Sequence, residues 1–217
     1  MTDIFNSGYA LPHMANVLVH VGFGTLAIIM GVAQFFTRKG GRAHRTIGRA
    51  YLAAFVIVLF TALFGSFVFG FRAFLASLTL SAGYWLLSGL RVLMIRSRGP
   101  GLIDHVFALL FIGLAIALAG FMRYGSVEST LPAYIALGNL VAICLYDIAR
   151  GLFGAAWVRK SWLNEHIYKM IGSHGALLSA AGGNLALAWQ PWSIFLPTTI
   201  SFILIALFIL RHPLRAS

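Results

Sequence analysis

The chain has 217 residues, of which 60% are hydrophobic and 10% are charged, and its mean hydropathy is +0.89. A soluble domain carries roughly 25% charged residues, so this composition excludes a soluble globular protein and predicts that most of the surface faces lipid. The formal net charge of +11 would suit a nucleic-acid-binding protein, but the basic residues separate apolar runs and form no soluble face, which excludes that class.

Apolar runs of membrane-spanning length follow one another along the chain. A helix needs roughly 20 mainly apolar residues to cross a hydrocarbon core of about 30 Å. Seven runs meet this requirement, at residues 13–36, 47–71, 73–96, 103–124, 130–150, 163–189 and 192–211. The sequence therefore predicts an all-α fold, a polytopic transmembrane helical bundle that forms a single domain over residues 1–217.

The basic residues predict the orientation of this bundle. With the N-terminus outside, all of the 16 Lys and Arg residues except Arg72 and Arg123 fall on the cytoplasmic side. Cytoplasmic loops are enriched in Lys and Arg, so we predict an external N-terminus, a cytoplasmic C-terminus and an odd number of spans. The basic cytoplasmic face is also expected to attract anionic lipid head groups.

The loop between the first two predicted spans is the most distinctive segment, Gly40-Gly41-Arg42-Ala43-His44-Arg45-Thr46-Ile47-Gly48-Arg49. Its two glycines permit a tight turn, and Thr46 is a suitable N-cap for the following helix. A positive cytoplasmic loop explains the arginines. It explains His44 less well, because histidine is mostly neutral at pH 7.

Polar and small residues recur at helical spacing in four of the predicted spans. These faces are expected to point into the bundle, because a polar group that faces lipid lacks a hydrogen-bond partner. Close helix packing through small and hydroxyl residues is a sufficient explanation for most of them. The faces comprise His20, Gly24, Ala27, Gly31 and Gln34; Ser77, Ser81, Tyr84, Ser88 and Arg91; Asn139 and Tyr146; and His166, Ser173, Ala180 and Asn184.

His20 and His174 fall deep inside their predicted spans, roughly 10 and 16 Å from the membrane faces at about 1.5 Å per residue. Ionisable residues at such depth are costly and by default indicate a functional site. Two histidines on different helices can ligate a haem iron, and neighbouring glycines would leave room for the ring. The sequence has no CxxCH motif, so we predict a non-covalent haem b, with Arg45 and Arg49 near its propionates. A proton relay is the alternative role.

A second group of histidines lies at the cytoplasmic ends of predicted spans: His44, His105 and His166. Two of them have acidic neighbours, Asp104 and Glu165, and imidazole with carboxylate can bind zinc, iron or copper. The five residues are therefore a predicted metal site, with solvated interfacial pairs as the alternative. Asp147 and Arg150, three residues apart, are expected to form a local ion pair at a helix end.

The stretch Gln34-Phe35-Phe36, followed by His44-Arg45 and Gly48-Arg49, resembles a bacterial membrane family catalogued as domain of unknown function 2306. His20, Gly24 and Gly31 fit the same pattern, and His166-Ile167-Tyr168-Lys169-Met170 is similar to a His-x-x-x-Met stretch of that family. The clear likeness covers residues 20–51. The resemblance implies a small multispan protein of the bacterial inner membrane with histidines near helix ends, and it implies no activity.

These observations favour a redox protein that uses haem b or a metal for electron transfer, with a quinone or another electron carrier as its partner. The first alternative is an intramembrane zinc-dependent lipid hydrolase, in which Asp104, Glu165 or Asp147 would shuttle protons. Against it, the sequence contains no HExxH pair. The second is a transporter or proton pathway with a polar route along Tyr84, Arg91, Asn139, His174 and Asn184. A non-catalytic assembly partner is the third.

Overall fold

A computed structural model describes residues 10–125 and 131–211, and these residues are almost entirely helical, with no strand among them. The prediction of an all-α helical bundle is confirmed. Six of the helices are long and apolar enough to cross a membrane. The helices are α1 (Ala10–Phe36), α2 (Arg42–Val68), α3 (Ala73–Ile95), α4 (Leu102–Tyr124), α5 (Leu131–Ala149), α6 (Gly154–Leu185) and α7 (Trp192–Arg211), with short 3-10 turns η1 (Arg96–Arg98), η2 (Arg150–Phe153) and η3 (Leu187–Trp189).

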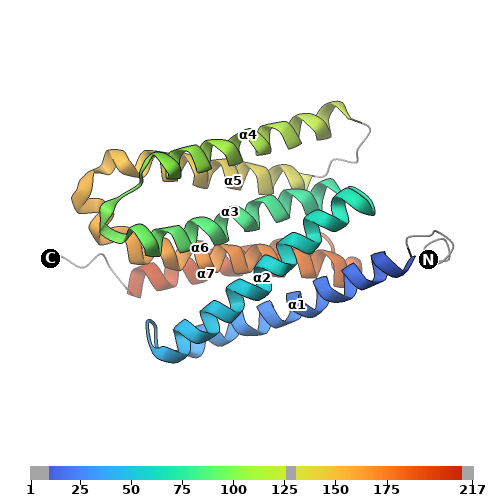
Figure 1. Ribbon diagram of the computed structural model, residues 1–217, viewed down its shortest axis with the longest axis horizontal. Helices are drawn as coiled ribbons and strands as arrows, with labels where there is room; N and C mark the ends of the chain where they lie inside the picture. Colours follow the sequence, from blue (N-terminus) through green and yellow to red (C-terminus); the bar gives the residue numbers. More distant parts are fainter. Residues whose placement is uncertain (1–9, 126–130, 212–217) are drawn as a thin grey trace. The chain divides into compact units, whose positions relative to one another are not determined.

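The chain divides into two compact units, residues 1–72 and 73–217. The first unit contains the hairpin of α1 and α2, and the second contains α3 to α7 (Figure 1). Each unit has its own packed helices. The prediction of one domain over the whole chain stays a prediction.

In the first unit, the turn between α1 and α2 is shorter than the sequence predicted. Gly40 adopts a φ of +73°, and the N–H of Gly41 donates to the carbonyl of Arg38 at 2.9 Å. The left-handed conformation is open to glycine at little cost, so the chain reverses within a few residues and α2 begins at Arg42, with Gly41 as its N-cap. The expectation that Thr46 caps this helix is therefore wrong, because Thr46 already lies inside it.

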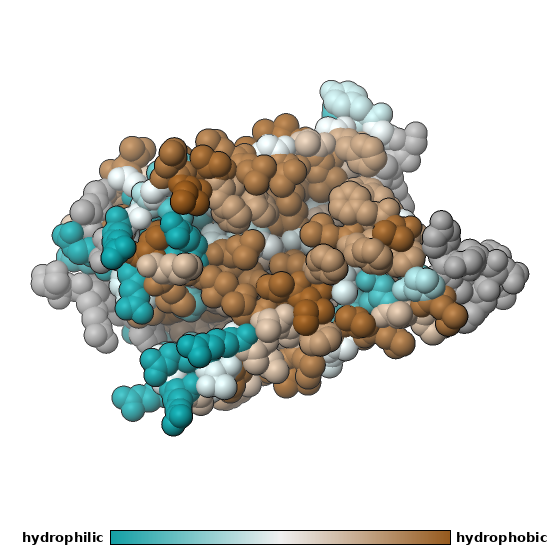
Figure 2. Space-filling model, viewed as in Figure 1, coloured by the Kyte–Doolittle hydropathy of each residue, from teal (hydrophilic) through white to brown (hydrophobic). Residues whose placement is uncertain are grey.

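The predicted polar face of α1 packs against α2. Ala27 is fully buried, and the side chain of Gln34 donates to the carbonyl of His44 at 3.0 Å. Figure 2 shows apolar side chains over most of the visible face of this hairpin and hydrophilic ones at the end that carries the turn. This pattern suits two spans with a polar loop at a bilayer surface.

In the second unit, α6 packs against both α3 and α7, while α4 and α5 form a pair against the other side of α3 (Figure 1). Two glycines allow α3 and α6 to approach closely. A side-chain carbon at Gly172 would overlap the ring of Trp85, and one at Gly89 would lie 3.0 Å from Cβ of Lys169. Residues of α3, α4 and α5, including Tyr84, Leu140 and Cys144, form the main hydrophobic core.

The sixth predicted span differs most from the structure. The helix α6 begins at Gly154 rather than near residue 163, and it is not among the six candidate spans. Val158 and Ser161, which were placed in a loop, are buried in its first turns. The charged residues Glu165 and Lys169 lie on α6 and are buried where this helix packs inside the unit. Whether α6 crosses the bilayer stays a prediction.

Candidate functional site

A buried ion pair joins α5 to α6 within the second unit. The ammonium nitrogen of Lys169 donates to both carboxylate oxygens of Asp147, at 2.6 and 2.7 Å. The side chain of Lys169 is 1% exposed and that of Asp147 is 9% exposed. A charge removed from water in this way is costly unless it is paired and hydrogen-bonded. Here the ammonium group gives the carboxylate a positive charge and two hydrogen bonds, and the carboxylate neutralises the ammonium charge.

Tyr84 on α3 completes this group. Its hydroxyl donates to Asp147 Oδ2 at 2.7 Å, and its ring stacks on Phe107 of α4 with centroids 5.5 Å apart. Tyr84 is the middle residue of α3, because eleven residues precede it and eleven follow it in Ala73–Ile95. The polar face predicted on this helix therefore brings a phenol to an ion pair in the interior of the unit.

A second buried ion pair lies beside the first. Arg150, in the turn η2 after α5, places Nη1 2.7 Å from Glu165 Oε2 on α6. The other oxygen of Glu165 accepts from the hydroxyls of Ser161 at 2.6 Å and Tyr146 at 3.2 Å. Nε and Nη2 of Arg150 are buried and have no hydrogen-bond partner among the described residues. The guanidinium thus keeps two buried donor atoms available for a further partner.

These pairings correct the expected local ion pair between Asp147 and Arg150. Asp147 binds Lys169, and Arg150 binds Glu165. The helix α5 ends at Ala149, so Arg150 belongs to the following 3-10 turn and no longer shares a helical face with Asp147. Glu165 and Lys169 stand at helix-pair spacing on α6, yet each bonds to a residue outside that helix.

A third ion pair lies nearer the basic end of the unit. Nε of Arg91 on α3 donates to Asp104 Oδ1 on α4 at 2.7 Å, and the N–H of Gly101 donates to Asp104 Oδ2 at 2.8 Å. The side chain of Arg91 is 38% exposed. Arg91 follows Ser88 and Tyr84 on one face of α3, so this partly exposed pair lies on the same helix face as the buried Tyr84.

A small cavity of about 20 Å³ connects the groups. Its lining includes Tyr84, Ser88, Arg91, Asp104, Asp147, Arg150 and Lys169. A space of this size has room for one water molecule, which needs two to four polar partners. The cavity is lined by side chains of both the exposed and the buried ion pairs, together with apolar ones.

Among the histidines of the first unit, His20 contacts α2 directly. Its Nδ1 lies 2.9 Å from the hydroxyl oxygen of Thr61, which also lies 2.8 Å from the carbonyl of Ile57. When the Thr61 hydroxyl donates to that carbonyl, its oxygen accepts from Nδ1–H, and Nε2 of His20 keeps its lone pair. This is the tautomer that a metal or haem iron requires.

The remaining residues of the predicted cofactor site are spread over both units. Nδ1 of His44 lies 3.0 Å from the hydroxyl oxygen of Thr37, while Arg45 and Arg49 are exposed on the first turns of α2. His174 is buried on α6. Because His20 and His174 belong to separate units, the prediction that they share a haem stays a prediction.

The predicted metal ligands of the second unit have other partners. His105 donates from Nδ1 to the carbonyl of Gly101 at 2.8 Å, and His166 donates from Nδ1 to that of Gly89 at 3.0 Å. Asp104 and Glu165 bind Arg91 and Arg150. Within residues 10–125 and 131–211, no three His, Cys, Asp or Glu side chains gather closely enough to hold a metal ion.

No protein-family model matches the chain, and no curated protein and no solved structure is detectably similar to it.

The sequence patterns point to the histidines and do not indicate the ionic network as a site. They predict an inward face for Tyr84 and a metal-ligand role for Glu165, but they do not pair Lys169 with Asp147. A signal was available: Asp147 interrupts an apolar run, and a charged residue at such a position by default has a functional partner.

Proposed function

We propose that the chain conducts protons across the bilayer through its second unit, with Asp147 and Lys169 as the central exchange site. The observation that carries the proposal is the contact between Lys169 and Asp147, two ionisable side chains almost inaccessible to solvent inside packed helices. Chains of ionisable groups in membrane interiors are typical of proton relays.

The chemistry of the pair supports exchange of a single proton. A proton that reaches Asp147 neutralises the carboxylate and weakens its hold on the Lys169 ammonium and on the Tyr84 hydroxyl. Lys169, no longer opposite a charge in a low-dielectric interior, then releases its own proton more easily. The proton that Lys169 releases passes to a water molecule in the neighbouring cavity. Transfer of the new proton from Asp147 to the neutral amine of Lys169 then restores the ion pair, so that one proton has been taken up and one released.

The groups beside Asp147 and Lys169 supply a proton route toward the end of the unit where the basic residues lie. The cavity beside Tyr84 and Arg150 has room for one water molecule. Arg91 and Asp104 lie where this route meets the surface. We assign this end to the cytoplasm by the distribution of basic residues.

Proton flux into vesicles tests the proposal. The purified protein is reconstituted into liposomes that contain a pH-sensitive dye, and a potassium diffusion potential drives protons inward. The unmodified chain should acidify the vesicles faster than protein-free liposomes. Asp147→Asn and Lys169→Gln should each lower the flux at least tenfold. Thr79→Ala is the matched control, since among the described residues the Thr79 hydroxyl bonds to the carbonyl of Leu75 on its own helix. Equal flux in Asp147→Asn and the unmodified chain would overturn the proposal.

Electron transfer through haem b is a second candidate, favoured by the contact between His20 Nδ1 and Thr61. In this reading the chain belongs with the domain of unknown function 2306 in the bacterial inner membrane and passes electrons to or from a quinone. His20 would present Nε2 to the iron, while His174 would be the second ligand and Arg45 and Arg49 would pair with the propionates.

A further inference from the structure

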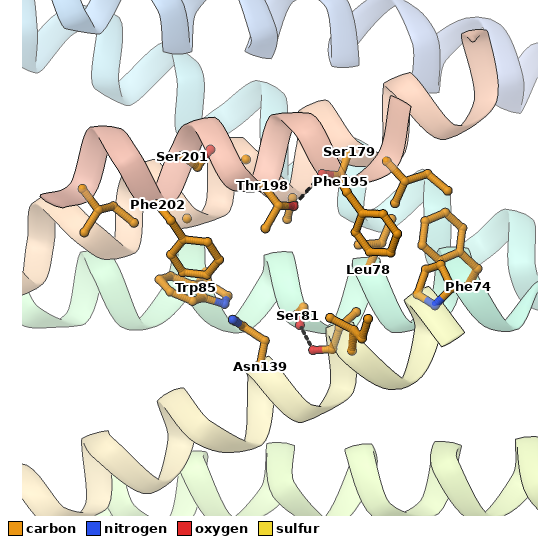
Figure 3. A pocket seen from close by; sticks show the side chains of 18 residues that line it. Phe74, Leu78, Ser81, Trp85, Asn139, Ser179, Phe195, Thr198, Ser201 and Phe202 are labelled. Atoms are coloured by element: carbon orange, nitrogen blue, oxygen red, sulfur yellow. Dashed lines mark hydrogen bonds between the residues drawn. The ribbon is translucent and has the colours of Figure 1, made fainter. Parts of the chain in front are cut away.

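A pocket of about 120 Å³ lies between α3, α5, α6 and α7, and none of the residues of the ionic network lines it. In Figure 3 the rings of Trp85 and Phe202 lie at one end of this pocket, and those of Phe74 and Phe195 lie at the other. An engineered apolar cavity of roughly 150 Å³ binds benzene. The pocket is therefore large enough for a short hydrocarbon segment.

Four hydroxyl groups in the pocket wall are already bonded within the protein. The Ser81 hydroxyl donates to the carbonyl of Ala136 at 2.8 Å, and the hydroxyls of Ser179 and Thr198 lie 2.8 Å apart (Figure 3). The Ser201 hydroxyl donates to the carbonyl of Pro197 at 2.9 Å. The wall also contains the amide of Asn139, but most of it is carbon, which favours an aliphatic ligand.

The pocket is open toward the lipid-facing surface. Ile135 on α5 and Phe202 on α7 line it and are 49% and 48% exposed. Both belong to helices that are apolar and long enough to span a membrane. The opening is therefore continuous with the surface that contacts the bilayer, and the molecules present there at high concentration are lipids.

We propose that this pocket binds the aliphatic chain of a membrane lipid, with the Trp85 ring against the chain. The same chemistry is shared by the acyl chain of a phospholipid and the isoprenoid tail of a quinone. The inference is independent of proton conduction, because none of the ionic groups lines the pocket.

Quenching of Trp85 fluorescence tests the proposal directly. In a variant whose other tryptophans, Trp157, Trp162, Trp189 and Trp192, are replaced by Phe, Trp85 is the single emitter. Its side chain is 7% exposed, so a lipid that remains at the outer surface would quench it weakly. In liposomes of phospholipid brominated near mid-chain we expect quenching of at least half of the emission. Ala176→Leu, which fills the pocket, should reduce this quenching at least twofold, whereas Ala117→Leu on the exposed face of α4 should not.

Native mass spectrometry of the chain with all five tryptophans provides a second measurement that does not depend on the Phe substitutions. The unmodified protein should retain a bound lipid, whose mass distinguishes a phospholipid from an isoprenoid quinone. Ala176→Leu should retain at least fivefold less of it than Ala117→Leu. Equal retention in these two variants, or quenching of Trp85 that Ala176→Leu leaves unchanged, would overturn the proposal.

Discussion

The ammonium nitrogen of Lys169 lies 2.6 and 2.7 Å from the two carboxylate oxygens of Asp147, and this contact joins the middle of α6 to the C-terminal end of α5. Removing one partner of a buried pair leaves an uncompensated charge, at a typical cost of about 3–5 kcal/mol. Lys169→Met and Asp147→Leu should each lower the free energy of unfolding by about that amount. The double variant should lose less than the sum of the two.

Unfolding in SDS, followed by circular dichroism, measures these differences. Thr79→Ala is again the control and should stay close to the unmodified protein. Additive losses in the double variant would contradict a direct interaction between Lys169 and Asp147.

The pair of Arg91 and Asp104 is predicted to limit access to the buried groups. Ser88 lines the same cavity as this pair. In a background where Cys144, the single native cysteine, is replaced by Ala, Ser88→Cys should react slowly with a charged thiol reagent. Arg91→Gln removes the ion pair and should raise that rate at least tenfold, measured by mass spectrometry of the labelled protein.

Ser77→Cys serves as the comparison, since Ser77 is buried on the same helix but does not line the cavity. Its labelling rate should not respond to Arg91→Gln. An unchanged rate at Ser88 would exclude Arg91 as the barrier, whether or not the protein conducts protons.

Close packing of α3 on α6 predicts that replacement by alanine destabilises the protein at one glycine and not at another. A side-chain carbon at Gly172 would overlap the Trp85 ring, while one at Gly113 on α4 meets nothing within 4 Å. Gly172→Ala should therefore destabilise the protein by about 1–3 kcal/mol. Gly113→Ala should be neutral or stabilise by up to about 1 kcal/mol, because alanine favours a helix. Thermal unfolding in detergent compares the two.

The haem prediction is tested by colour. Protein purified from cells supplied with a haem precursor should show a Soret band, and His20→Ala should remove or shift it. Thr61→Val, which removes the oxygen that contacts His20 Nδ1, should shift the band less. A colourless unmodified protein would rule out haem binding by His20 and His174.

The predicted orientation is tested by reporters fused after Lys160 and after Gln190. If α6 crosses the bilayer with its N-terminal end in the cytoplasm, a fluorescent protein is active after Lys160 and a periplasmic phosphatase is active after Gln190. The same reporter active at both positions would show that α6 does not cross.

Most helix positions and inward faces were predictable because they depend on local spacing, although Asn184, predicted on an inward face of α6, is exposed. Ser77 and Tyr84 recur at helical intervals, so their common face follows from the sequence alone, and both are buried. The pairing of charges was not predictable in this way, because it depends on which helices meet. Arg150 is three residues from Asp147 in the chain, but its partner is Glu165.

The start of α6 was missed for a related reason. Gly154 to Trp162 contains basic residues and no long apolar run, so the segment reads as a loop. It is helical because Val158 and Ser161 are buried in the unit. Tertiary packing, rather than hydropathy, determines where this helix begins. The two-unit division likewise has no signal in composition, since apolar spans continue on both sides of Arg72.

Proline at position 197 lies inside α7. Its ring has no N–H, so the carbonyl of Ser193, one turn earlier, loses the donor that a regular helix would provide. That same carbonyl oxygen lies against Gly182 of α6, where a side-chain carbon would overlap it. The hydrogen bond missing from α7 thus coincides with a close contact between α7 and α6, and beyond this point the contact between the hydroxyls of Thr198 and Ser179 joins the two helices again.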